Sequence, residues 1–371
     1  MSKVDFLKKE NLSEYFINFH IVPMVAAIWS MHPSEAKLMP LNFFINFFKN
    51  HGLFKLKNRP QWFTVTNRSK TYVDKVIRQI SGEYYKNYPI KKISWFRVGG
   101  SAELLFKPKD LTDLKKFMYL KPSNVPVTIL GGASNTLIRD NGIPGVVIVL
   151  DRAFNYIKQT AFDSIECGAA VPSKKISNFA LKNNLGGLSF LNTIPGTFGG
   201  AVKMNSGAYG AEVADILISA KFIDHKGNEF ESNLSDICYG YRSSNISDDM
   251  ICISATIRGS IANRDEIIQE INRYKKHRDS AQPIKERTGG STFKNPINIK
   301  AWELIRDAGC SGLSSGDAVI SRLHTNFIIN KGNATAYDIE LLGEKIKKRV
   351  KEKTGIDLEW EIRTVSYTHL R

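Results

Sequence analysis

The segment RTGGSTFKNP, residues 287–296, places a serine directly after two glycines and directly before a Thr-Phe-Lys-Asn-Pro run. Glycine has no Cβ atom, so the backbone at such a position can come close to another group. Two interpretations follow from the residues: a tight turn that enters a strand, or Ser291 held against a ligand. The turn is the more ordinary interpretation for this segment by itself.

Two other glycine-rich segments have the composition of backbone ligand sites. In ILGGASNTLIRDNG, residues 129–142, a strand pattern runs into Gly131 and Gly132, and successive free N–H groups there would form a nest for a diphosphate. NTIPGTFGGAVKMNSGAYG, residues 192–210, carries five glycines and polar anchors that could wrap a dinucleotide. Neither segment has the G-x-G-x-x-G pattern of a Rossmann fold, and ordinary tight turns are the alternative for both.

Helix and strand patterns surround these segments. SAELLFKPKDLTDLKKFMYL, residues 101–120, predicts a strand followed by a helix that Asp110 caps. TAYDIELLGEKIKKRVKEKTG predicts a long helix with Thr335 and Asp338 in a capping box and Gly355 at its end.

Between these two patterns the sequence signals change from helix to β structure. SKKISNFALKNNLGG predicts a helix that stops at Gly186, and residues 213–258 have the turn and strand signals of hairpin-rich β structure. A second domain is expected to start near Arg264.

Eight motifs occur in a fixed order between Ser81 and Val365. They are SWFRVGGSAELLFKP, LGGASNTLIRD, TIPGTFGGAVKMNSGAYG, YGYRSS, QPIKERTGGSTFKNP, AWELIRDAGCSGL, NFIINKGNATAYDI and LEWEIR. This series closely resembles the UDP-N-acetylenolpyruvoylglucosamine reductase family. The short spacing from YGYRSS to GGSTFKNP is typical of the form that lacks the extra substrate-binding tyrosine loop.

The resemblance implies an α+β protein with a split FAD-binding fold of the vanillyl-alcohol-oxidase type, followed by a smaller α+β substrate-binding domain. The FAD-binding region would cover residues 81–262 in two subdomains that meet near residue 150. The substrate-binding domain would cover residues 263–357. A strand over residues 358–365 would then return to the FAD-binding region.

The resemblance also implies a reaction in peptidoglycan precursor synthesis. NADPH would reduce FAD, which would pass hydride to UDP-N-acetylglucosamine enolpyruvate and give UDP-N-acetylmuramate. Negative charge then develops beside the substrate carboxylate, so the site needs an electrophile. Arg242 matches the family arginine that would supply it, and Glu361 matches a glutamate that would help hold the carboxylate. Ser291 matches the serine that gives the final proton.

The other site residues follow from the same motif matches. Lys294 and Asn295 are implied to hold the substrate. The residues implied to bind FAD are Gly131, Gly132, Ala133, Ser134, Asn135, Thr193, Ile194, Pro195, Gly196, Thr197, Gly199, Gly200, Gly207 and Ala208. No metal site is expected, and His324 is interpreted as structural. Taken singly, an arginine or a glutamate on a β segment is usually a surface residue, so the roles depend on the ordered set.

Four residues depart from the family pattern. Thr193 stands where the family commonly has glycine, and Ala133 replaces a residue of the usual Gly-x-Gly-Ser turn. Ser315 and Asp317 occupy positions usually filled by an aliphatic residue and a glycine. These departures affect the geometry of the flavin loops more than the reaction.

The overall composition and charge bear on whether the protein binds nucleic acid or a membrane. The 371 residues include 42% apolar and 24% charged residues, with a formal net charge of +16. The basic residues are dispersed and no nucleic-acid-binding motif occurs, so no nucleic-acid partner is expected. The early apolar run at residues 21–31 is too short for a membrane span. The four cysteines are far apart and predict reduced thiols, and we expect a cytoplasmic monomer.

The two ends do not fit the family. Residues 1–80 are expected to be an extraneous helical fragment, because about residues 1–78 resemble an internal piece of a flavin-containing amine-oxidase-like protein. Residues 366–371 resemble a sequencing-adapter read-through and are expected to be a non-native tail. The alternatives to the reductase are another FAD-dependent oxidoreductase on the same fold, a basic nucleic-acid-binding protein, and an inactive chimeric gene product.

Overall fold

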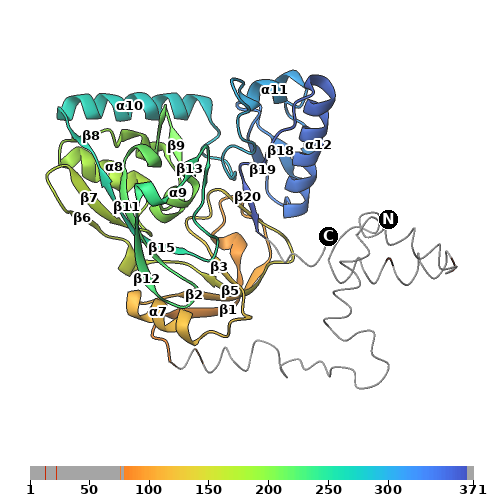
Figure 1. Ribbon diagram of the computed structural model, residues 1–371. Coiled ribbons are helices and arrows are strands. Elements are labelled where there is room, and N and C mark those ends of the chain that lie inside the picture. The colour runs from red at the N-terminus through yellow and green to blue at the C-terminus, as the bar shows by residue number, and fades with distance from the viewer. Residues whose placement is uncertain (1–12, 14–21, 23–75, 77–78, 366–371) are drawn as a thin grey trace. The chain divides into compact units, whose positions relative to one another are not determined.

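The computed structural model describes residues 79–365 together with Ser13, Val22 and Val76. The expectations of an amine-oxidase-like fragment and of a non-native tail fall almost entirely outside these described residues. The segment from residue 79 to residue 365 belongs to one compact unit, which is coloured in Figure 1. Its elements form three parts, each built around its own sheet.

The first part is a four-stranded sheet with one helix against it. Its strand order is β1-β2-β5-β3, in which β2, β5 and β3 run parallel and β1 is antiparallel to β2. The bounds are β1 Glu83–Pro89, β2 Ser101–Lys107, β3 Val127–Ile129, β5 Ile143–Ile148 and α7 Leu111–Leu120. The predicted helix cap is confirmed, because the Asp110 carboxylate accepts a hydrogen bond from the Asp113 N–H at 2.9 Å. Leu114, Phe117 and Met118 face the core.

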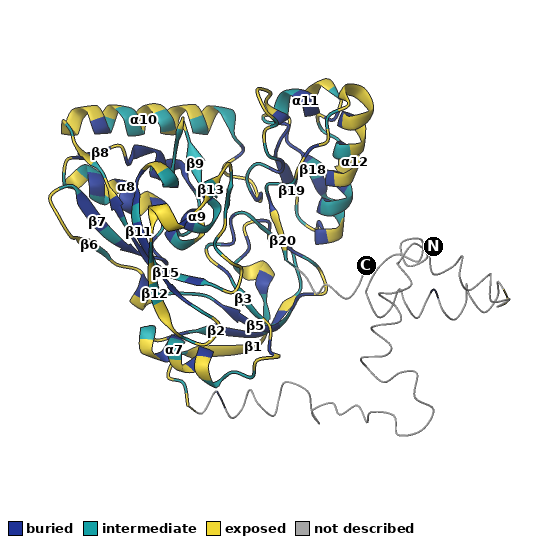
Figure 2. Cartoon of the chain, in the orientation of Figure 1, coloured by how far each residue is buried: buried dark blue, intermediate teal, exposed yellow. Residues whose placement is uncertain are grey.

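The second part is an antiparallel five-stranded sheet in the order β12-β11-β15-β7-β6. Its bounds are β6 Ile157–Gln159, β7 Ser164–Gly168, β11 Leu217–Ile223, β12 Glu229–Asn233 and β15 Ile251–Arg258. Apolar residues of helices α8 (Ser173–Lys182) and α9 (Phe198–Met204) share one core with this sheet. Helix α10 (Arg264–Ala281) packs on α8, and only its Ile267 is buried (Figure 2). The predicted hairpin-rich β structure is therefore confirmed.

The prediction that a helix stops at Gly186 is wrong. Helix α8 ends at Lys182, and Asn184 then adopts a left-handed φ of 55°, a conformation that asparagine tolerates better than most residues. Gly186 instead lies in strand β8 (Leu185–Gly186), which pairs with β16 (Ser260–Ile261). An asparagine, and not the glycine, therefore ends the helix.

The third part holds a three-stranded antiparallel sheet and two helices. The bounds are β17 Ser314–Ser315, β18 Ala318–Ile320, β19 Ile328–Asn330, α11 Ala301–Asp307 and α12 Ala336–Thr354. The capping box of Thr335 and Asp338 is confirmed, and so is the end of α12 at Gly355, which has a φ of 75°. After α12 the chain forms β20 (Arg363–Val365; Figure 1), which pairs parallel with β4 (Thr136–Ile138) in a separate two-stranded sheet.

Short elements complete the described residues. The strands are β9 Gly207–Ala208, β10 Ala211–Glu212, β13 Tyr239–Gly240 and β14 Ser243–Ser244, and the 3-10 helices are η2 Ile90–Lys92, η3 Arg152–Phe154, η4 Ser189–Thr193, η5 Val213–Asp215 and η6 Leu234–Asp236. None of the helices described is both long enough and apolar enough to cross a bilayer.

Candidate active site

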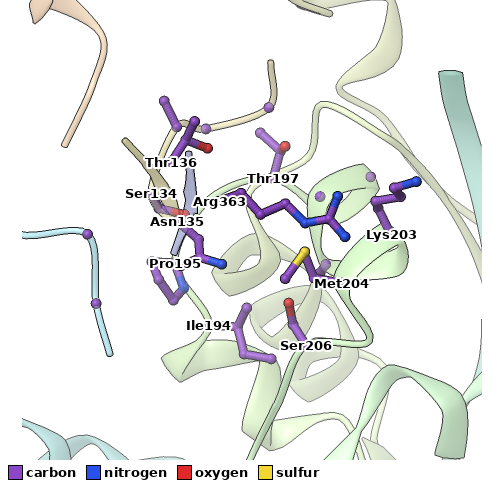
Figure 3. A pocket seen from close by; sticks show the side chains of 18 of the residues that line it. Ser134, Asn135, Thr136, Ile194, Pro195, Thr197, Lys203, Met204, Ser206 and Arg363 are labelled. Carbon is purple, nitrogen blue, oxygen red and sulfur yellow. The ribbon is translucent and has the colours of Figure 1, made fainter. Parts of the chain in front are cut away.

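A pocket of about 750 Å³ lies where the three parts meet. Its volume is in the usual range for small-molecule and cofactor sites. All of the residues that the sequence assigned to FAD and to catalysis line it, except Gly196. The substrate residues Lys294 and Asn295 do not line it. Figure 3 shows that the lining side chains come from the loop before β4, from the α9 region and from β20.

The loop from Gly131 to Asn135 forms one wall through its backbone. Among the described residues, none accepts a hydrogen bond from the backbone N–H groups of this loop. Ala133 has a φ of 49°, in the left-handed region, where a non-glycine residue is strained. Successive unpaired N–H groups around a left-handed residue are the arrangement of an anion-binding nest. The loop therefore fits the diphosphate of a dinucleotide.

The second glycine-rich loop packs directly against this nest. A Cβ atom on Gly132 would lie 2.6 Å from the Cα of Gly196, and one on Gly131 would lie 2.6 Å from the Thr197 Oγ1. The contact of Gly132 is with backbone, so this glycine is needed for the approach of the two loops. At Gly131 a side chain would displace the Thr197 hydroxyl. A Cβ atom on Gly196 would lie 2.5 Å from the Ser134 Oγ, so the second loop also packs closely on the nest at this position.

Thr193 fits its position although the family commonly has glycine there. Its hydroxyl donates to the Phe190 carbonyl at 2.8 Å, so the polar group is satisfied within the loop. Asn205 has a left-handed φ of 45°. Its side-chain oxygen accepts a hydrogen bond from the Ala214 N–H at 2.9 Å, and its amide nitrogen donates to the Gly240 carbonyl at 3.1 Å. This asparagine holds the corner of the loop that leads to Gly207.

Arg242 reaches this corner from the β13–β14 hairpin. Its Nη2 donates to the Gly207 carbonyl at 2.7 Å, and its Nε lies 3.3 Å from the Glu361 Oε1. A Cβ atom on Gly207 would lie 2.6 Å from the Ala211 carbonyl and 3.0 Å from the Arg242 Nη1, so the paired backbone of β10 requires glycine here, and a side chain would also press on the guanidinium. Arg242 has a φ of 53°, and a strained backbone of this kind is often found at functional sites.

Glu361 and Ser291 are brought together by backbone pairing. The Glu361 N–H donates to the Thr292 carbonyl at 2.9 Å, and the segments around them form an antiparallel bridge at Phe293 and Trp360. The Glu361 side chain is 17% exposed. Burial raises the pKa of Glu361, and Arg242 opposes that increase only in part. Glu361 therefore keeps a proton at higher pH than an exposed glutamate.

Asn326 fixes the backbone that follows Ser291, and the sequence interpretation missed it. The Thr292 N–H donates to the Asn326 carbonyl at 2.7 Å. The Asn326 side chain accepts from the Phe293 N–H at 2.9 Å and donates to the Phe293 carbonyl at 2.8 Å. Asn326 is 3% exposed, so these hydrogen bonds do not compete with water. Its one signal was its place at the start of the motif NFIINKGNATAYDI, which does not identify the partner of its side chain.

Lys294 and Asn295 have partners outside the pocket. The Lys294 Nζ lies 3.3 Å from the Glu359 Oε2. The Asn295 Oδ1 accepts from the Ala301 N–H at 3.0 Å, and its Nδ2 donates to the Tyr241 hydroxyl at 3.4 Å. Their role in holding the substrate stays a prediction.

Several charged residues that the sequence interpretation did not single out also line the pocket. They are Lys203, Asp248, Arg278 and Arg363. Burial lowers the pKa of Arg278, whose Nε donates to the Gln282 side chain at 3.3 Å. The pattern held one signal for Arg363, because it lies two residues after Glu361 and side chains alternate along an extended chain. In the described part of the chain, no group of three or more His, Cys, Asp or Glu could hold a metal.

Two family models match the chain. One is described as an FAD binding domain and matches residues 102–233, and the other is described as the C-terminal domain of UDP-N-acetylenolpyruvoylglucosamine reductase and matches residues 282–365. The expected split FAD-binding α+β fold and the FAD cofactor are thereby confirmed.

Full-length relatives and a solved structure agree with these matches. The chain is 45% identical to the UDP-N-acetylenolpyruvoylglucosamine reductase of Parvibaculum lavamentivorans over 77% of this chain and 92% of the relative. It is 46% identical to that of Azorhizobium caulinodans over 77% and 93%. The crystal structure of the reductase from Thermus caldophilus superposes with a TM-score of 0.67 at 31% identity, over 77% of this chain and 99% of that chain. The chain therefore belongs to the UDP-N-acetylenolpyruvoylglucosamine reductase family.

Proposed function

We propose that this chain uses NADPH and FAD to reduce UDP-N-acetylglucosamine enolpyruvate to UDP-N-acetylmuramate, in peptidoglycan precursor synthesis. The observation that carries the proposal is the Arg242–Glu361 ion pair, 3.3 Å long, on the wall that also holds Ser291. A cation, a protonatable carboxyl and a hydroxyl at one place suit a substrate that gains a negative charge and then a proton.

The flavin would be held by the two glycine-rich loops. The unpaired N–H groups from Gly131 to Asn135 suit its diphosphate, and Gly199, Gly200 and Ala208 leave room on the facing wall. When bound, FAD supplies the hydride transfer between NADPH and the double bond of the substrate. The loops themselves contribute binding and orientation.

The three side chains would act on the substrate carboxylate and on the carbon beside it. Arg242 binds the carboxylate and stabilises the enolate-like charge, because its guanidinium is already oriented by the Gly207 carbonyl. Glu361, protonated more readily than an exposed glutamate, donates a hydrogen bond to the same oxygens. Ser291 delivers the proton to the carbon. Lys294 and Asn295 would contact the substrate only if their side chains leave their present partners.

The proposed division of the chain departs from the three parts of the structure at helix α10, which it assigns to the substrate-binding domain. Residues 81–262 would bind FAD, residues 263–357 would close over the substrate, and residues 358–365 would carry Glu361 back to the flavin. Helix α10 belongs by its packing to the second part. The family model for the C-terminal domain begins at residue 282, after this helix.

We also propose that the protein works as a monomer in the cytoplasm. All four cysteines are free, and Cys167 and Cys310 are buried, which suits a reducing compartment. Light scattering on the purified full chain would test the proposed state. A mass of twice the monomer at micromolar concentration would contradict it.

Spectroscopy on the full chain tests the proposed reaction. The flavin absorption should bleach when NADPH is added without oxygen, and it should return when UDP-N-acetylglucosamine enolpyruvate is added. A flavin that oxygen re-oxidises quickly but the enolpyruvate does not would favour another flavin-dependent oxidoreductase. A protein that binds no flavin would contradict the proposal.

A further inference from the structure

Two ion pairs run from one short segment of the C-terminal strand region to the second part of the fold. Glu361 pairs with Arg242, and two residues later the Arg363 Nη1 lies 3.3 Å from the Asp248 Oδ1. Ile362 between them is 2% exposed and faces the core. The alternation places Glu361 and Arg363 on the same side, and both line the pocket.

Asp248 holds a second cation with the same oxygen atom. The Lys203 Nζ lies 2.9 Å from the Asp248 Oδ1, and it also donates to the Ile246 carbonyl. The Asp248 side chain is 86% exposed, whereas the Lys203 side chain is 21% exposed. The carboxylate is therefore the solvated member of the cluster, and exposed ion pairs are weak and easily exchanged.

The two cations stand opposite the nest. The Arg363 N–H donates to the Asn135 carbonyl at 3.1 Å, so its backbone adjoins the end of the nest loop. From there the Arg363 side chain reaches across the pocket toward Lys203 (Figure 3). An anion in the nest would thus have unpaired N–H groups on one side and two side-chain cations on the other. Asp248 neutralises one of those positive charges.

We propose that Arg363 and Lys203 form the side-chain half of the FAD diphosphate site, and that Asp248 competes with the diphosphate for these two cations. This inference rests on the proposed use of FAD. The cluster then has a net charge of +1 against the diphosphate, and removal of the Asp248 charge would raise it to +2. The sign of that effect separates competition from a structural role, because an ion pair that only supports the fold weakens binding when either partner is lost.

Flavin titrations of the apoprotein test the proposal. FAD fluorescence is followed as the full-chain apoprotein is added, for the wild type, Arg363→Gln, Lys203→Gln and Asp248→Asn. We expect Arg363→Gln to raise the Kd for FAD about 10- to 100-fold, as loss of a charge-assisted hydrogen bond would. Asp248→Asn should lower it about two- to fivefold, the effect expected of an exposed ion pair. Lys351→Gln, in the exposed Lys351–Asp357 pair outside the pocket, is the matched control and should change nothing.

Two further measurements identify the group that is bound. Riboflavin lacks the diphosphate, so its Kd should be the same in all four proteins. The KM for NADPH of the FAD-loaded proteins should also stay unchanged. The salt dependence of FAD binding should be shallower in Arg363→Gln and steeper in Asp248→Asn than in the wild type.

Several results would overturn the inference. Weaker FAD binding by Asp248→Asn would make the cluster a structural ion pair. Equal shifts for FAD and riboflavin, or a shift for NADPH alone, would place the cations elsewhere on the ligand path. A wild type that binds FAD while the variants behave alike would overturn only this inference, whereas a wild type that does not bind FAD would overturn the proposed function as well.

Discussion

Arg242 and Glu361 form an ion pair of 3.3 Å between the β13–β14 hairpin and the segment before the last strand, β20. The chain supplies these two residues from parts of the fold that have separate cores. Their side chains are 19% and 17% exposed, so the pair is largely removed from water. A buried ion pair adds to the stability of the fold only when its geometry is good. Because this pair lies on the pocket wall, we infer that it serves to bind the ligand.

The pH profile of the second half-reaction should depend on Glu361. Burial raises the pKa of this carboxyl, so the proton that it donates to the substrate carboxylate is lost as the pH rises through that raised value. The rate of substrate reduction should therefore fall on the alkaline side. Glu361→Gln should remove this limb, because an amide donates a hydrogen bond at every pH. The measurement is the rate of flavin re-oxidation by substrate between pH 5 and pH 9.

Glu352→Gln is the control for that profile. Its side chain is 63% exposed and pairs with Lys348 on α12, outside the pocket. It should keep the wild-type profile. A limb that persists in Glu361→Gln would show that another group titrates.

Asn326 should act as a positioning residue for Ser291. In Asn326→Ala the buried N–H and carbonyl of Phe293 lose their partners, which should cost about 1–3 kcal/mol of unfolding free energy for each group. Substrate reduction should slow, while flavin reduction by NADPH should change little. Asn326→Asp keeps the hydrogen-bond acceptor and loses the donor, so its stability and its rate of substrate reduction should lie between those of Asn326→Ala and the wild type. Asn333→Ala, an exposed asparagine on a nearby loop, should match the wild type in both assays.

Replacing Gly289 or Gly290 by alanine should destabilise the fold, for a different reason at each position. A Cβ atom on Gly289 would lie 2.3 Å from the Phe96 ring, which is fully buried, so overpacking should cost about 1–3 kcal/mol. Gly290 has open space but a φ of 85°, so its alanine variant should be strained by about 1–2 kcal/mol. Urea unfolding measures both. Phe96→Leu should restore stability to the Gly289→Ala protein only, and rescue of both variants would contradict the steric cause.

Local signals predicted the elements well and the site only in part. The Asp110 cap and the Thr335–Asp338 box depend on residues three apart, so the sequence states them directly. The end of α8 was misplaced because two asparagines before Gly186 could also end the helix. The ordered motifs supplied most of the flavin and catalytic residues that line the pocket, but they did not single out its charged residues Lys203, Asp248, Arg278 and Arg363.

What the sequence could not predict depends on contacts between distant segments. Asn326 binds the backbone of Phe293, and the motif NFIINKGNATAYDI that contains Asn326 does not reveal this distant partner. Lys203 and Asp248 meet only because α9 and the loop after β14 lie side by side. The sequence predicted that Gly131 and Gly132 let a ligand come close to the backbone. The structure shows that they also let the loop around Gly196 and Thr197 pack against them.

The most direct test of the account is the pair of half-reactions in Ser291→Ala, followed by stopped-flow absorption without oxygen. Flavin reduction by NADPH should keep its wild-type rate. Re-oxidation by UDP-N-acetylglucosamine enolpyruvate should slow about 10²–10⁴-fold, the usual contribution of a general acid. Ser311→Ala, an exposed serine, should leave both rates unchanged. Equal losses in both half-reactions, or no loss in the second, would contradict the role of Ser291 as the proton donor.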